Sequence, residues 1–122
     1  MNYGEWNHQL LKIIREARDL ISDESRWTQG ALARNISGEP TISFGGEAVC
    51  WCALGALNYA FSRQKVLRDL DEVIETFRAL GFRKKHITDI NDLQGHEPVL
   101  RVFDQVINRL EEIVYGHATR RS

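Results

Sequence analysis

The feature that most constrains this chain is residues 51–57, which read Trp-Cys-Ala-Leu-Gly-Ala-Leu and are apolar at almost every position. A helix that is hydrophobic around most of its circumference is buried, so we expect residues 47–62 to form a central helix that other helices cover. Gly55 within that helix costs about 1 kcal/mol of helix stability relative to alanine. The close approach of another backbone would explain a residue without a side chain at this position.

Apolar residues recur every three or four positions over residues 4–23, 64–80 and 98–115, a spacing that predicts amphipathic helices. Shorter helical stretches are expected over residues 27–34 and 87–92. Together with the buried segment, these patterns predict an all-α fold, a compact bundle of four main helices with one or two short helices.

Residues 35–46 interrupt the helical pattern with Gly, Pro, Ser and Asn, which predicts one long irregular loop. Within it, residues 41–44 give the only hint of a strand. Long loops in compact domains are often functional, so this loop is a candidate site. We expect the tail, residues 117–122, to be frayed.

With 122 residues, the chain has the length of one domain, which we expect to span residues 1–122. Its formal net charge of −1 gives no general attraction to nucleic acid. The candidate patches for nucleic-acid binding are residues 83–86, which read Arg-Lys-Lys-His, and Arg120-Arg121 in the tail. We rank weak nucleic-acid binding last among the functions considered.

The chain carries no apolar stretch approaching the roughly 18 residues of a membrane span and no signal-like N-terminus, so we expect a cytoplasmic protein without a membrane partner. Its cysteines, Cys50 and Cys52, fall on the expected central helix about 200° apart on its circumference and cannot bridge each other there. Two such thiols also make a poor zinc site. We expect reduced cysteines, no metal and no cofactor.

Cys52 is the sharpest candidate for chemistry, because a nucleophilic thiol needs a base and the chain offers Asp92 and His96. Its apolar neighbours argue for core packing instead, since burial raises the pKa of a thiol and makes it inert. His96 precedes the last helix, where it could cap that helix or act as an acid or base. Capping is the preferred interpretation.

Three motifs together resemble a family of small uncharacterised proteins found in bacteria and phages: Trp27-x-x-Gly30-Ala31, the segment 51–57, and Asn91-Asp92. The resemblance spans residues 25–107. It implies a shared fold and a phage or mobile-element setting, and it supplies no catalytic residue. The family commonly continues the Asn-Asp pair with a Pro-Gly turn, whereas this chain has Leu-Gln-Gly-His at residues 93–96.

The preferred hypothesis is a non-enzymatic protein-binding module, a small phage or mobile-element accessory or inhibitor protein that docks a host protein. The loop 35–46 and the neighbouring Trp27 stretch would form the contact, with the partner-binding residues Trp27, Arg34, Phe44, Asn91 and Asp92. For the Asn-Asp pair, capping and turn formation are the favoured interpretation. The alternative is a small cysteine-dependent enzyme that uses Cys52 with Asp92 and His96. A homodimer is also possible, although the heptad pattern is too short for a coiled coil.

Overall fold

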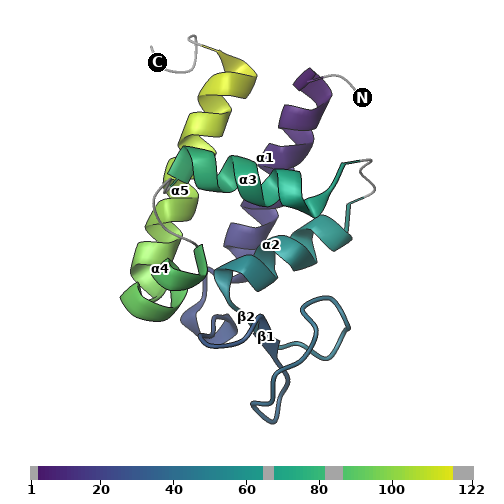
Figure 1. The fold of residues 1–122 in the computed structure, drawn as a ribbon, viewed down its shortest axis with the longest axis vertical. Helices are drawn as coiled ribbons and strands as arrows, with labels where there is room; N and C mark the ends of the chain where they lie inside the picture. Colours follow the sequence, from purple (N-terminus) through teal and green to yellow (C-terminus); the bar gives the residue numbers. More distant parts are fainter. Residues whose placement is uncertain (1–2, 65–67, 82–86, 117–122) are drawn as a thin grey trace.

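The computed structural model describes residues 3–64, 68–81 and 87–116 (Figure 1). Helices dominate these ranges, and the two paired strands are short. The elements are α1 (Tyr3–Leu20), the 3-10 helix η1 (Glu24–Arg26), β1 (Ala33–Arg34), β2 (Cys50–Trp51), α2 (Ala53–Ser62), α3 (Leu70–Gly81), α4 (Ile87–Gln94) and α5 (His96–Tyr115). The predicted fold class, a compact helical bundle of four main helices with short helices in the connections, is confirmed. The basic residues 83–86 and the tail 117–122 lie outside the described residues.

Helices α1 and α5 lie side by side and antiparallel, with the first turn of α1 and the last turn of α5 at the same end of the molecule (Figure 1). Helix α3 crosses this pair and packs on α5 and α2, while α4 packs on α5 and α2. Phe77 of α3 and Phe103 of α5 meet at the centre, with ring centroids 4.7 Å apart in an edge-to-face arrangement. The core thus joins residues from distant parts of the chain.

Ion pairs on the outer surface follow the antiparallel order of α1 and α5. Arg15 pairs with Glu111, and Arg18 pairs with Asp104 at 2.9 Å, so later residues of α1 meet earlier residues of α5. The buried stripe of α1 repeats every three or four residues, as the sequence predicts, and contains Trp6, Leu10, Ile13, Ile14 and Ala17.

Two of the predicted helices begin later in the chain than predicted. The central helix predicted over residues 47–62 begins only at Ala53, and the helix predicted over 64–80 begins at Leu70. Cys50–Trp51 instead forms β2, with Trp51 opposite Ala33 of β1. A short apolar run is compatible with a buried helix or a buried strand, and here strand pairing decides between them. The short helix predicted over residues 87–92 is confirmed as Ile87–Gln94.

The helix predicted over residues 27–34 is wrong. Trp27 has extended backbone angles (φ −112°, ψ 144°), and the Thr28 N–H donates to the Trp51 carbonyl at 3.0 Å. Gly30 has a positive φ of 78°, which a continuous right-handed helix does not allow. Pairing with β2 therefore overrides the helical pattern of this segment.

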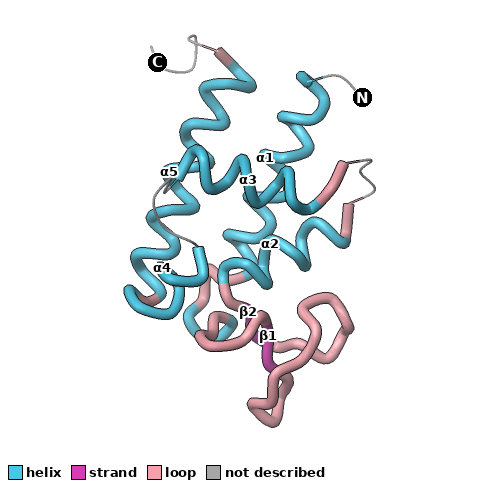
Figure 2. The backbone as a smooth tube through the Cα atoms, viewed as in Figure 1, coloured by secondary structure: helices cyan, strands magenta, loops and turns pink. Residues whose placement is uncertain are grey.

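The connection from β1 to β2 is irregular over residues 35–46, as predicted, and extends from the bundle at the end opposite the first turn of α1 (Figure 2). The suggested strand at residues 41–44 is absent, and only Pro40 forms an isolated bridge, with Arg34. This loop is the largest part of the described chain outside the helices.

Gly55 permits the close backbone approach that the sequence suggests. A Cβ atom at this position would lie 1.9 Å from the carbonyl oxygen of Leu32. That same oxygen accepts a hydrogen bond from the Cys52 N–H at 3.0 Å. The first turn of α2 is therefore pressed against the segment that leads into β1.

Gly55→Ala should lower the free energy of unfolding by about 3 kcal/mol, because the added methyl group meets backbone that cannot move aside. Helix propensity alone predicts the opposite sign, a gain of about 1 kcal/mol. Urea denaturation of both proteins measures the difference. Gly45→Ala is the control, since its Cβ would meet only the Ile42 side chain, at 3.1 Å. A Gly55→Ala protein as stable as the parent would contradict the packing described.

Candidate functional site

Asn91 of α4 is fully buried and lies at the centre of a polar cluster. Its Oδ1 accepts from the Trp27 indole N–H at 2.6 Å and from the Ala53 N–H at 2.9 Å. Its Nδ2 donates to the Thr28 carbonyl at 2.9 Å and to Asp92 Oδ1 at 3.1 Å. These bonds use the full capacity of a side-chain amide. We call Trp27, Thr28, Ala53, Asn91 and Asp92 the Asn91 cluster.

Asp92 and Gln29 extend this cluster across the end of α4. Asp92 Oδ1 also accepts from the Gly30 N–H at 3.1 Å, and Gln29 Nε2 donates to the carbonyls of Asn91 and Asp92 at 2.8 and 3.1 Å. Asp92 is exposed, whereas Asn91 is enclosed and has no surface to offer a partner. The Asn-Asp pair thus holds residues 27–30 against the bundle. This structural role differs from the predicted capping and turn formation, because α4 continues to Gln94 and the bonds join distant segments.

Arg34 organises the base of the loop. Its guanidinium donates to Thr28 Oγ1 at 3.0 Å, to the Gln29 carbonyl at 3.0 Å and to the Gly38 carbonyl at 3.1 Å. Arg34 therefore joins Thr28 and Gln29, which precede β1, to Gly38 in the loop. Its bonding makes Arg34 a positioning residue for the loop.

Cys52 is the N-cap of α2, and its Sγ accepts from the Gly55 N–H at 3.3 Å. The thiol is buried, and this desolvation raises its pKa above the ordinary value, outweighing the lowering effect of the Gly55 N–H. A hollow of about 200 Å³ is lined by Cys52, Asp92 and residues 30–32. The structure therefore brings Cys52 and Asp92 to one hollow, where burial of the thiol disfavours the thiolate.

His96 belongs to a different contact. Its Nε2 lies 2.6 Å from the Ile21 carbonyl, and because a carbonyl only accepts, that nitrogen carries the proton. Its ring centroid is 5.3 Å from that of the Trp27 indole. The N-cap of α5 is Gly95, so the preferred capping role of His96 is wrong. His96 does not line the hollow beside Cys52 and Asp92, and the three candidate catalytic residues do not converge there.

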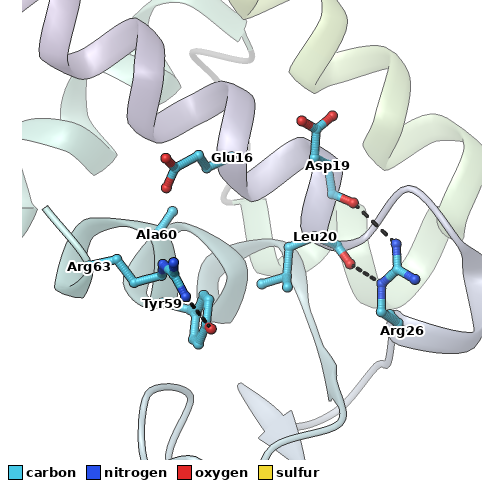
Figure 3. Close-up of a pocket in the computed structure, with 7 residues that line it drawn as sticks. All are labelled: Glu16, Asp19, Leu20, Arg26, Tyr59, Ala60 and Arg63. Carbon is cyan, nitrogen blue, oxygen red and sulfur yellow. Dashed lines mark hydrogen bonds between the residues drawn. The ribbon is translucent and has the colours of Figure 1, made fainter.

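A second hollow, of about 400 Å³, lies between the end of α1 and α2 (Figure 3). Arg26 at its edge donates to the carbonyls of Leu20 and Asp19, at the end of α1. Arg63 donates to the Tyr59 hydroxyl at 3.0 Å. Both guanidinium groups thus already have partners within the protein. No sequence pattern predicts this hollow, because its residues come from two stretches far apart in the chain: Glu16, Asp19, Leu20, Arg26, Tyr59, Ala60 and Arg63.

The segment from β1 to β2 exposes an apolar surface. Four of the seven large exposed hydrophobic residues of the described chain lie on it, and a fifth, Leu32, directly precedes β1. We call these five the apolar loop surface: Leu32 (42% exposed), Ile36 (90%), Ile42 (61%), Phe44 (52%) and Val49 (43%). Sequence reasoning selected Phe44 alone. Ile36 and Ile42 lie in the loop 35–46 that the sequence predicts as the contact, but they were not singled out, because an irregular segment carries no periodicity that shows which way a side chain faces. Leu32 and Val49 fall on segments that were predicted to be helical.

No helix in residues 3–64, 68–81 and 87–116 combines the length and apolar character needed to cross a membrane. In the same ranges, no group of three or more His, Cys, Asp or Glu side chains is placed to hold a metal ion.

Fold and site define a small helical domain whose long loop is held to the bundle by a buried asparagine. The chain belongs to a family of unknown function, DUF6197, whose sequence model matches residues 7–109. That range includes the Asn91 cluster and the whole apolar loop surface. No curated protein and no solved structure matches the chain.

Asn91→Ala should lower the free energy of unfolding by about 3 kcal/mol, because the buried N–H groups of Trp27 and Ala53 lose their acceptor. Asn108→Ala, at an exposed position of α5, is the control and should change it by less than about 0.5 kcal/mol. Chemical denaturation followed by tryptophan fluorescence measures both. Equal stability of the two variants would show that the cluster contributes little.

Cys52 should resist iodoacetamide in the folded protein near neutral pH. In a Cys50→Ser background, which leaves Cys52 as the remaining thiol, modification should be markedly slower than in denaturant, since burial shields the sulfur and raises the pKa of the thiol. Mass spectrometry over time measures the rate. The rate should keep rising above the ordinary thiol pKa. Rapid modification of the folded protein at neutral pH would instead support the cysteine-dependent enzyme.

Proposed function

We propose that this protein is a non-enzymatic protein-binding module that contacts its partner through the apolar loop surface. The observation that carries the proposal is the exposure of Ile36, Ile42 and Phe44 on one loop. Several large apolar side chains exposed on one loop are typical of interaction sites, because they remain in water unless a partner covers them. The raised pKa of the Cys52 thiol favours this function over the enzymatic alternative.

Burial around Ser43 supports the proposal. Ser43 is 1% exposed, while its neighbours Ile42 and Phe44 face solvent. The Trp51 indole N–H donates to the Ser43 carbonyl at 2.8 Å, and Asn58 Nδ2 donates to Ser43 Oγ at 2.9 Å. At this point the loop buries a polar residue and exposes the apolar residue on either side of it, the reverse of the usual hydrophobic pattern.

The other arm of the loop is also held in place. Asn35 Oδ1 accepts from the N–H groups of Ser37 and Glu39 at 3.0 and 3.1 Å, and the Asn35 N–H donates to the Glu39 carbonyl at 2.9 Å. A loop with a defined conformation loses less entropy on binding than a flexible one. These bonds therefore favour a preformed recognition surface.

Within this proposal the candidate partner-binding residues take two roles. Phe44 contacts the partner directly. Trp27, Arg34, Asn91 and Asp92 position the loop through the hydrogen bonds described above, so their substitution weakens binding by disturbing the loop.

The setting that we propose follows from the resemblance to small bacterial and phage proteins. In that setting the protein is an accessory or inhibitor protein of a phage or mobile element, acting on a host protein in the cytoplasm. Its free cysteines are compatible with a reducing compartment.

Substitution of Ile36 and Phe44 by serine should abolish partner capture. Tagged protein serves as bait in a host lysate, and mass spectrometry identifies what a salt wash leaves bound. The double variant should lose a partner that the parent protein retains at stoichiometric amounts. It should keep the parent's thermal midpoint within a few degrees, because both side chains are exposed.

The matched control is Ile113→Ser together with Tyr115→Ser, at the C-terminal end of α5, where two similarly exposed apolar residues lie far from the loop (Figure 1). This control should retain the partner. An empty bait, or loss of the partner from both variants alike, would contradict the proposed surface. Size-exclusion chromatography of the same proteins shows whether the captured partner is a second copy of the chain.

A further inference from the structure

The two arms of the loop enclose a hollow of about 470 Å³. Asn35, Ile36 and Ser37 line one side, and Glu47 and Val49 line the other. Ile36 and Val49 give it apolar walls, and Glu47 is its only charged lining residue. The hollow adjoins the apolar loop surface, with which it shares two residues.

The charged residues of the loop around this hollow are all acidic. Residues 35–49 contain Glu39 and Glu47 but no lysine or arginine. The nearest cation along the chain, Arg34, has its guanidinium bonded to three neutral oxygens at the base of the loop. The Glu47 carboxylate makes no hydrogen bond or ion pair with the described residues 3–64, 68–81 and 87–116. An unpaired anion between apolar walls is complementary to a side chain with an aliphatic stem and a cationic end.

We propose that this hollow receives a lysine or arginine side chain of a partner protein. This inference rests on the proposed function. The aliphatic stem packs between Ile36 and Val49, and the cationic end pairs with the Glu47 carboxylate. Apolar residues that flank the basic residue in the partner cover Ile42 and Phe44. The partner segment that fits this surface is therefore basic at one position and apolar on either side of it.

The ion pair provides specificity more than affinity, because a pair at a solvent-exposed position contributes little free energy and is weakened by salt. Apolar contacts would supply most of the binding energy. The ion pair and the apolar contacts can therefore be tested separately by substitution. Removing the Glu47 charge changes which peptides bind, whereas removing the apolar residues abolishes binding.

A phage-displayed library of random dodecapeptides, selected on the intact protein, tests the inference. The peptides recovered should carry lysine or arginine between apolar residues. By fluorescence anisotropy, a recovered peptide should bind Glu47→Gln about threefold more weakly than the parent protein and Glu47→Lys at least about tenfold more weakly, with the loss largest at low salt. Replacing the basic residue of the peptide by glutamate should restore binding to Glu47→Lys.

The matched control is Glu39→Lys, which makes the same charge change on the same loop but outside the hollow, and it should alter the affinity by less than about twofold. Peptides that lack a basic residue and bind Glu47→Lys as well as the parent protein would overturn the inference. If Ile36→Ser and Phe44→Ser still abolished their binding, the proposed function would stand. If those serine variants left peptide binding intact, or no peptide were recovered, the proposed function itself would fail.

Discussion

The side-chain amide of Asn91 is the interaction on which the rest of this structure depends. It bonds to α2 through the Ala53 N–H, to the extended segment through Trp27 and Thr28, and to its own neighbour Asp92. A buried amide with every donor and acceptor satisfied is compatible with one arrangement of its neighbours, because any other leaves polar groups unpaired away from water. Asn91 thereby fixes where the loop leaves the bundle.

From this fixed point the loop is built outward by a series of side-chain bonds. Asp92 and Gln29 hold the turn at Gly30, and Arg34 joins that turn to the carbonyl of Gly38. The loop therefore has a defined shape without regular secondary structure of its own. Its apolar residues face solvent because the bonded backbone turns them outward, which connects a buried asparagine to a surface suited to binding.

Opposing influences act on Cys52 at the start of α2. The N-terminus of a helix favours a thiolate, and the Gly55 N–H points at the sulfur. Burial acts in the other direction and is the larger effect, so the pKa of the thiol is raised. The thiol serves as a helix cap in the core. Its place beside Trp51 puts it at the junction of β2 and α2.

The sequence by itself determined the helical fold, because amphipathic periodicity over three or four turns is a strong and local signal in α1 and α5. It also determined the irregular character of residues 35–46 and the need for a close contact at Gly55. Only the tertiary structure decided that residues 27–34 are not helical, that Cys52 caps α2, and that His96 lies apart from it. These outcomes depend on pairing between segments distant in the chain, such as Ala33 with Trp51 and Trp27 with Asn91, whose bonds no local pattern encodes. The exposure of Ile42 accompanies such a bond as well, since the Trp51 indole N–H holds the carbonyl of the neighbouring Ser43.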